Sequence, residues 1–285
     1  MNVTITGATG FIGRRLAEVL QQNGHQVRPL SRTEWNVTAA EPPSQSLVKA
    51  DAIVHLAGEP VAQRWTLEAK RKILDSRVRG THNIVTALST LSRRPQVMVC
   101  SSAIGIYGER GDELLTESSP AGSGFLADVC KEWEQQADLA ASLGMRVVKL
   151  RTGIVLGKNG GALQKILPPF RAFVGGKIGS GRQWMSWIHL DDLVGVIRHA
   201  IEHPLNGVVN GTAPNPATNS QFTGELAVAL RRPALFPVPA FALKAMFGEM
   251  SEMLLSSQRV LPKAAESGGY RFQFPQLGEA LRDLL

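Results

Sequence analysis

Residues 3–13, which read VTITGATGFIG, decide the fold. Residues 3–6 form an apolar-rich strand pattern that runs directly into glycines at positions 7, 10 and 13. A helical pattern follows over residues 14–23. A strand, a tight glycine turn and a helix start, in this order, are what a dinucleotide-binding site needs. The sequence therefore predicts an α/β fold that begins with a Rossmann-type unit.

Each glycine of this turn has a distinct physical role. Gly7 can adopt a turn conformation that is barred to other residues. Gly10 lets the backbone approach a pyrophosphate closely, and Gly13 lets the helix lie tight on the sheet. The helix start also offers free N–H groups and a positive dipole end to phosphates. A glycine turn that binds nothing is the alternative, but the strand–turn–helix context favours a cofactor site made by Gly7, Thr9, Gly10, Phe11, Ile12 and Gly13.

Composition is that of a globular protein. The chain has 285 residues, 44% of them hydrophobic and 19% charged, which is enough for one large domain or two closely joined ones. No apolar run approaches the roughly 18 residues that span a bilayer. The first residues are a strand rather than a secretory leader. The two cysteines lack metal-ligand spacing, so we expect a reduced, cytoplasmic setting and no metal.

The chain is basic, with a net charge of +7. This charge permits weak affinity for nucleic acid but does not require it. The basic residues are scattered, and no run reaches the five to eight lysines or arginines of a typical patch. We therefore expect a small-molecule substrate, with neither nucleic acid nor a membrane as a partner.

Strand and helix patterns alternate along the first half of the chain. Strands are predicted at 26–30, 52–58, 96–100, 145–150 and 208–210, and helices at 64–79, 80–91 and 124–143. Asp191 is expected to cap a helix that runs to His203. Such alternation predicts a doubly wound parallel sheet, with a smaller, mostly helical substrate lobe. The dinucleotide-binding domain is expected at 1–160 with 187–212 returning to it, and the substrate lobe at 161–186 and 213–285.

The residues after the second strand bear on cofactor choice. An NAD-preferring site usually has an acid here, which holds the ribose 2′-hydroxyl. This chain has Ser31 and Arg32, with Glu34 the only acid nearby. A guanidinium group suits a 2′-phosphate, which favours NADP over NAD. Small residues at the end of the next strand leave room for the cofactor, so the predicted site also includes Leu56, Ala57, Gly58 and Glu59.

Several motifs together resemble the extended short-chain dehydrogenase/reductase superfamily. They are residues 6–13, HLAG at 55–58, Ser101-Ser102 with Tyr107-Gly108, and WIHLDD at 187–192. The segments RTGIVLG at 151–157, LPPF at 167–170 and GRQ at 181–183 are similar to its epimerase-like branch.

The resemblance covers essentially the whole chain, and residues 237–285 resemble the small C-terminal domain of unassigned function found in that branch. It implies a Rossmann-type domain that binds NADP(H), with Ile154 among the cofactor contacts. A homodimer through the helices near 64–91 and 124–143 is left open.

The chain departs from the superfamily where catalysis is expected. The superfamily uses a tyrosine as general acid/base, a lysine four residues later and a serine or threonine that orients the substrate. Tyr107 is followed four positions later by Gly111, and Tyr270 by Phe274, so no Tyr-x-x-x-Lys is present. The serine position is Ala103. The remaining catalytic candidates are Ser101, Ser102, Tyr107 and Lys131, each of which has an ordinary structural alternative.

Two functions from different classes follow. The first is an NADP-dependent oxidoreductase or epimerase with an atypical active site, acting on a small polar or nucleotide-linked substrate. The second is a non-catalytic protein that senses NADP(H) or binds a protein partner. Because a positioned acid or base typically contributes about 10²- to 10⁴-fold to a rate, the missing tyrosine keeps the second function open.

Overall fold

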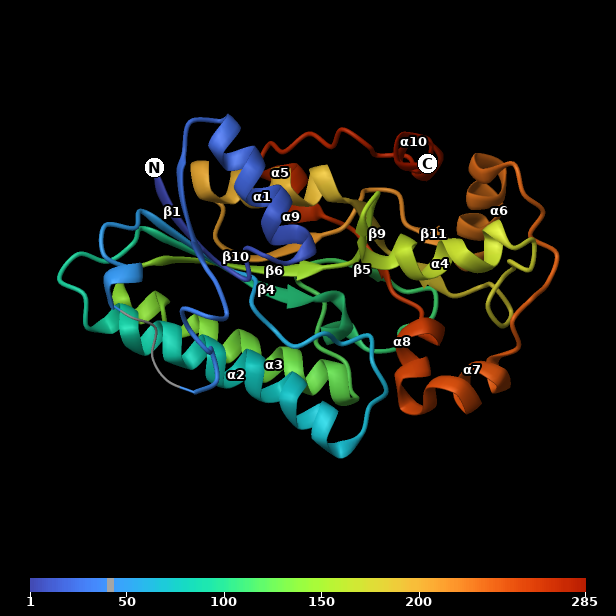
Figure 1. Cartoon of the computed structure of the whole chain (residues 1–285), viewed down its shortest axis with the longest axis horizontal. Helices are drawn as coiled ribbons and strands as arrows, with labels where there is room; N and C mark the ends of the chain where they lie inside the picture. The colour runs from blue at the N-terminus through green and yellow to red at the C-terminus, as the bar shows by residue number, and fades with distance from the viewer. Residues whose placement is uncertain (40–43) are drawn as a thin grey trace.

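The computed structural model describes residues 1–39 and 44–285 (Figure 1). Its centre is a six-stranded sheet in the order β10-β6-β4-β3-β1-β2. Every neighbouring pair in this sheet is parallel. The strands are β1 (Asn2–Thr6), β2 (Gln26–Leu30), β3 (Ala52–His55), β4 (Val97–Ala103), β6 (Arg146–Thr152) and β10 (Gly207–Gly211).

Proline at position 29 fits because β2 is an edge strand. Pro29 lies opposite Ile5 of β1, and among the described residues no strand pairs with β2 on its other side. A proline lacks the backbone N–H that a residue in a central strand donates to a neighbouring strand. The edge position of β2 therefore removes the conflict that Pro29 would create in the middle of the sheet.

Helices cover both faces of the sheet (Figure 1). One face carries α1 (Phe11–Gln22), α5 (Leu190–Glu202) and α9 (Lys263–Ser267), and the other carries α2 (Leu67–Ser89) and α3 (Phe125–Asp138). Strand side chains alternate between two apolar cores, with Val99 in one and Met98 in the other. A parallel sheet needs this cover because both of its faces are apolar. The predicted doubly wound α/β fold is confirmed.

Some predicted boundaries were wrong. The two helices predicted at 64–79 and 80–91 are one helix, α2, which continues through Gly80. A side chain at Gly80 would crowd Val37, whose Cβ lies 3.3 Å from the position of an added Cβ, so this glycine serves close packing rather than a break. The helix predicted at 124–143 ends at Asp138 and is followed by a short turn of 3-10 helix, Ala141–Leu143.

The cap of α5 was also predicted wrongly. The N-cap is His189, whose Nδ1 accepts a hydrogen bond from the backbone N–H of Asp191 at 3.1 Å. Between β2 and β3, a 3-10 turn at Ser44–Ser46 is the only regular element in the described ranges 31–39 and 44–51. Part of this stretch, residues 40–43, lies outside the described residues.

A smaller lobe lies beyond the carboxyl ends of the sheet strands (Figure 1). Its helices are α4 (Gly161–Arg171), α6 (Asn219–Leu230), α7 (Ala240–Phe247), α8 (Glu252–Leu255) and α10 (Leu277–Leu284). Two-stranded pairings link it to the rest: β7 (Ile154–Gly157) with β9 (Trp187–His189), β8 (Trp184–Met185) with β11 (Ala217–Thr218), and β5 (Leu114–Leu115) with β12 (Arg259–Val260).

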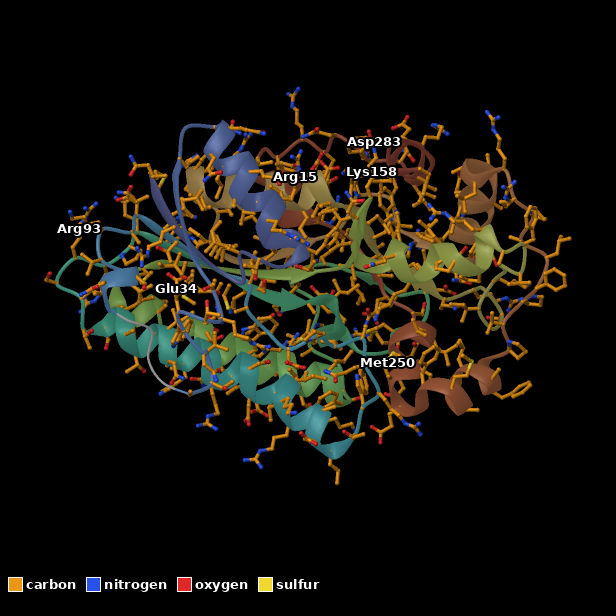
Figure 2. All side chains as sticks on the ribbon, viewed as in Figure 1. Arg15, Glu34, Arg93, Lys158, Met250 and Asp283 are labelled. Carbon is orange, nitrogen blue, oxygen red and sulfur yellow. The ribbon has the colours of Figure 1, made fainter. Side chains whose placement is uncertain are left out.

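Charged side chains point outward around the molecule (Figure 2). Arg93 pairs with Asp51 at 2.7 Å, close to the amino ends of β3 and β4. Arg15 pairs with Asp191 at 2.6 Å and so ties α1 to α5. Within the described ranges, no helix is both long enough and apolar enough to cross a membrane.

Candidate functional site

The carboxyl ends of β1 and β3 border an open cavity of about 850 Å³. From β1, the chain passes through α1 to β2 on one side, and β3 lies on the other side. The strand order therefore reverses at β1, which creates a crevice between the loops that leave β1 and β3. In open α/β sheets, ligands bind at such a switch point.

Close backbone contacts leave no room for a side chain at Gly7 or at Gly13. Gly7 has φ +70°, and an added Cβ would lie 2.9 Å from the backbone of Leu56 and Ala57. An added Cβ at Gly13 would lie 2.3 Å from the carbonyl oxygen of Gly7. Two segments thus approach each other closely where β1 meets α1. This is the close packing that a dinucleotide turn requires.

The start of α1 is suited to phosphates. Its N-cap, Gly10, makes no side-chain capping hydrogen bond, and the first turn of α1 contains no acidic residue. The first N–H groups of the helix are therefore not used by a side-chain cap, and no carboxylate opposes the positive end of the helix dipole. The residues present fit the pyrophosphate of a dinucleotide.

The structure brings most of the predicted cofactor residues to this cavity. The predicted cofactor residues that line it are Gly7, Thr9, Gly10, Ser31, Arg32, Leu56, Ala57, Gly58 and Glu59. Four other predicted residues do not line it. The ring of Phe11 lies against the loop at 157–161, Ile12 packs against the sheet core, Gly13 lies inside α1, and Ile154 begins β7.

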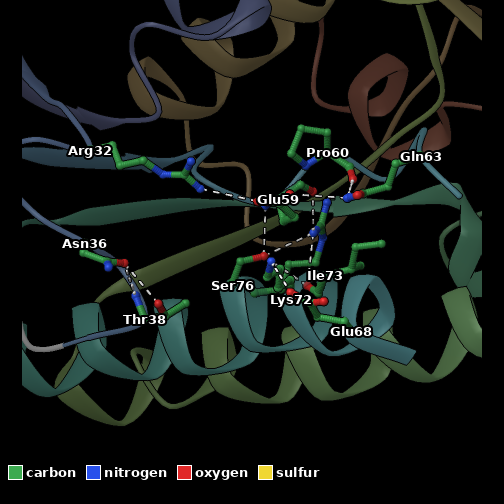
Figure 3. A network of polar contacts seen from close by, with 11 residues as sticks. Arg32, Asn36, Thr38, Glu59, Pro60, Gln63, Glu68, Lys72, Ile73 and Ser76 are labelled. Carbon is green, nitrogen blue, oxygen red and sulfur yellow. Dashed lines mark hydrogen bonds and ion pairs between the residues drawn. The ribbon is translucent and has the colours of Figure 1, made fainter. Parts of the chain in front are cut away.

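Arg32 and Ser31 lie at the end of the cavity next to β2. The Arg32 side chain is 81% exposed and reaches Glu59 at 3.4 Å (Figure 3). Ser31 donates its backbone N–H and its hydroxyl to the Glu34 carboxylate at 2.9 and 3.0 Å. These hydrogen bonds lower the pKa of Glu34. Glu34 therefore binds the loop itself and does not line the cavity.

Helix α2 forms a wall that the sequence reasoning missed. Lys72, Asp75, Ser76 and Arg79 all line the cavity. Ser76 accepts a hydrogen bond from the backbone N–H of Glu59 at 2.9 Å, which fixes the loop after β3 against α2 (Figure 3). The spacing i, i+3, i+4, i+7 places these four side chains on one helix face. That polar stripe was visible in the sequence. Residues 35–38 of the loop after β2 also line the cavity and were missed.

Tyr107, a catalytic candidate, is fully buried away from the cavity. Its hydroxyl donates to the Asn210 side chain at 2.7 Å and lies 3.1 Å from the carbonyl oxygen of Thr116. The Arg151 guanidinium donates to the same hydroxyl at 3.0 Å. Burial raises the pKa of Tyr107. The structure thus places this tyrosine in a buried polar network, at the ends of β6 and β10.

Ser102 belongs to the same network. Its hydroxyl donates to Glu134 at 2.7 Å, and Arg151 holds both oxygens of that carboxylate at 2.8 and 2.9 Å. All three residues are buried. Ser101 lies on the opposite face of β4, by strand alternation. In the described part of the chain, none of the catalytic candidates Ser101, Ser102, Tyr107 and Lys131 lines the cavity.

Lys131 and the cysteines offer no substitute for the missing tyrosine. Lys131 is half-buried on α3 and pairs with Asp128 at 2.6 Å. Burial raises the pKa of the Cys100 thiol to about 12 and that of Cys130 to about 11. Thiols with such pKa values are not nucleophilic at neutral pH. Among the described residues, no group of histidine, cysteine or acidic side chains could hold a metal ion.

The parallel sheet, the glycine turn and the switch-point cavity define a Rossmann-type dinucleotide-binding fold. The model of the NAD dependent epimerase/dehydratase family matches residues 3–213, and the domain of unknown function DUF1731 matches residues 238–284. The chain belongs to the NAD-dependent epimerase/dehydratase family and carries a DUF1731 domain at its C-terminal end. The predicted resemblance to the extended short-chain dehydrogenases is confirmed.

Similar proteins span the full chain. An Arabidopsis thaliana epimerase family protein, SDR39U1 homolog, chloroplastic, is 42% identical and aligns over 100% of this chain and 87% of its own length. The epimerase family protein YfhF of Bacillus subtilis is 37% identical, with 100% and 98% covered. The crystal structure of human epimerase family protein SDR39U1 (isoform 2) with NADPH has a TM-score of 0.91 at 35% identity, covering 100% of this chain and 99% of the human one.

Proposed function

We propose that the chain binds NADP(H) in the cavity between β1 and β3 and uses it as an oxidoreductase or epimerase with an atypical active site. The single observation that carries this proposal is the placement of Arg32 at the same cavity as Gly7 and Gly10. The glycines suit a pyrophosphate, and an exposed guanidinium suits a 2′-phosphate. The NADPH in the human relative's structure supports the same cofactor.

The chain's own residues would bind and orient this cofactor. The start of α1 would hold the pyrophosphate, and Ser31 with Arg32 would hold the 2′-phosphate of the adenosine ribose. Leu56, Ala57 and Gly58 would leave room for the dinucleotide above β3. When bound, the nicotinamide ring supplies hydride transfer. We propose a small polar or nucleotide-linked substrate, in line with the family to which the chain belongs.

A second function is a non-catalytic protein that senses NADP(H) or binds a protein partner. One observation favours it: Tyr107 and Ser102 are bonded within a buried network, so their hydroxyls do not reach the cavity. Substrate-dependent oxidation of NADPH across carbonyl and sugar-nucleotide panels would support the enzyme. Tight NADPH binding without turnover in the same panels would support the sensor.

A homodimer through α2 and α3 is a further proposal, which light scattering on the purified protein tests.

Arg32 provides the test of cofactor binding. We expect Arg32→Ala to weaken NADPH binding about tenfold, because a charge-assisted hydrogen bond to a phosphate is worth about 1.5–3 kcal/mol. Affinity for NADH, which lacks the 2′-phosphate, should change less than about twofold. Paired fluorescence titrations of the wild type and the variant with both cofactors measure this difference. Equal losses for NADPH and NADH would exclude the proposed role of Arg32.

A further inference from the structure

The face of α2 that lines the cavity carries charged side chains that are not among the predicted cofactor contacts. Lys72, Asp75, Ser76 and Arg79 lie on this face and span about two turns of the helix. They line the same cavity as the glycine turn and Arg32. A wall of this kind, rich in side chains that can hold charge, can select among dinucleotides that differ by one phosphate.

Three of these four side chains already have a partner. Lys72 pairs with Glu68 at 2.6 Å, and Asp75 pairs with Arg71 at 3.5 Å. Ser76 accepts from Glu59 and donates to the carbonyl oxygen of Ile73. Arg79 is exposed, and over residues 1–39 and 44–285 it makes no hydrogen bond or ion pair. Within the described residues, its guanidinium can therefore bind a ligand without first breaking a contact.

Arg79 borders the same end of the cavity as the loop that carries Arg32. Val37 packs beside Gly80, the neighbour of Arg79, and Asn83 donates to the carbonyl oxygen of Val37 at 2.9 Å. The loop after β2 thus crosses α2 next to Arg79. Arg32 enters the cavity from the start of this loop, and Arg79 enters from the helix beneath it.

We infer that Arg79 is a second determinant of NADP(H) specificity, which binds the 2′-phosphate together with Arg32. The inference rests on the proposed binding of NADP(H) in this cavity. A phosphomonoester carries a charge of about −1.5 to −2 at neutral pH. Arg32 is partly neutralised by Glu59 at 3.4 Å, so one guanidinium alone leaves much of the phosphate charge uncompensated. Arg79 supplies a positive charge that no carboxylate pairs with in the described structure.

The test uses the full chain with four single variants, Arg32→Ala, Arg79→Ala, Arg79→Lys and Arg93→Ala, and with the double variant in which Arg32 and Arg79 are both replaced by alanine. Arg93 is the matched control, because its removal changes the net charge equally at the amino-terminal end of the sheet (Figure 2). The probes are NADPH, NADH, adenosine 2′,5′-bisphosphate and AMP. Dissociation constants are measured by calorimetry at low and at moderate salt.

We expect Arg79→Ala to weaken NADPH and adenosine 2′,5′-bisphosphate about fivefold, because an exposed charged contact contributes modestly. Affinity for NADH and AMP should stay within about twofold, as should all affinities of Arg93→Ala. The double variant should bind NADPH no more tightly than NADH, and Arg79→Lys should retain part of the preference.

Three other outcomes separate this inference from the proposed function. If Arg32→Ala alone abolishes the NADPH preference and Arg79→Ala changes nothing, NADP(H) binding stands and the role of Arg79 is refuted. Equal losses for NADPH and NADH in Arg79→Ala would also refute it, since the contact would not involve the 2′-phosphate. If the wild type binds neither dinucleotide, the proposed function itself fails.

Discussion

Over the ends of β1 and β3 the sheet opens into the cavity, whereas over the ends of β4, β6 and β10 it is filled by side chains that bond to one another. In the open half, Arg32 and Arg79 are exposed and line a space of about 850 Å³. In the closed half, the buried residues Ser102, Glu134, Arg151 and Tyr107 form hydrogen bonds with one another.

This difference separates binding from catalysis. The open half keeps the features of a dinucleotide site, with groups available to a ligand. The closed half contains the tyrosine and the serine that the family resemblance made catalytic candidates, and there they form part of the packing. A buried network that is fully satisfied rigidifies a fold and leaves no group free for a substrate. The comparison predicts that mutations in the closed half reduce stability and that mutations in the open half reduce binding.

The largest loss of unfolding free energy is expected for Arg151→Met. This change leaves the Glu134 carboxylate buried without its charged partner, which typically costs about 3–5 kcal/mol of unfolding free energy. The control is Arg93→Met, which removes an arginine from an exposed pair with Asp51 and should cost at most about 1 kcal/mol. Chemical denaturation of both variants measures the two losses. A loss below 1 kcal/mol for Arg151→Met would show that the network does not stabilise the closed half.

A second, smaller effect concerns His55, which lies beneath the open half. Its Nδ1 shares a 2.6 Å hydrogen bond with the Thr6 hydroxyl, and burial, with the nearby charge of Arg77, lowers the pKa of His55 to about 3. The unfolded chain takes up a proton near pH 6.5, but the folded chain does not. Stability from this group is therefore present above pH 6.5 and is lost as the pH falls from 6.5 toward 3.

The comparison of the wild type with His55→Gln isolates the contribution of His55 protonation to the pH dependence of stability. Below pH 6.5 the wild type should lose stability more steeply than the variant by up to about 1.4 kcal/mol per pH unit. Unfolding free energies measured by urea denaturation between pH 7 and pH 4.5 give both slopes, and the carboxylates common to both proteins cancel in the difference. Parallel slopes would mean that His55 is protonated in the folded protein.

The sequence predicted the open half better than the closed half, for a physical reason. The residues at 7–13 and 31–32 follow strand ends within a local pattern, so their meeting at the cavity follows from the topology of any Rossmann-type unit. The wall made by Lys72 and Arg79 was missed because a polar helix stripe usually faces solvent. The loop that crosses α2 at Val37 and the loop that Ser76 holds after β3 turn this stripe into a cavity wall.

The closed half could not be predicted because its contacts join residues far apart in the chain. Tyr107 bonds to Asn210 across 103 positions, and Arg151 reaches Glu134 on a different element. The buried pair of Arg151 with Glu134 depends on how β6 packs beside α3, which no local sequence pattern predicts. The helix boundaries failed for a similar reason, since packing against Val37 lets α2 continue through Gly80.

Tyr107→Phe is expected to cause the smallest loss of unfolding free energy. It is also the sharpest test of the difference between the open and closed halves. The ring keeps its volume, but Asn210 and Arg151 each lose a partner at the hydroxyl. A buried hydrogen bond lost in this way costs about 1–2 kcal/mol of unfolding free energy. The affinity for NADPH should remain within about twofold, because the hydroxyl does not line the cavity. Because burial raises the pKa of Tyr107, its hydroxyl should stay protonated at neutral pH, and any NADPH turnover should keep its pH profile in the variant. Unchanged stability together with a turnover loss of about 100-fold or more would reverse this assignment, and would make Tyr107 the general acid that the closed half otherwise lacks.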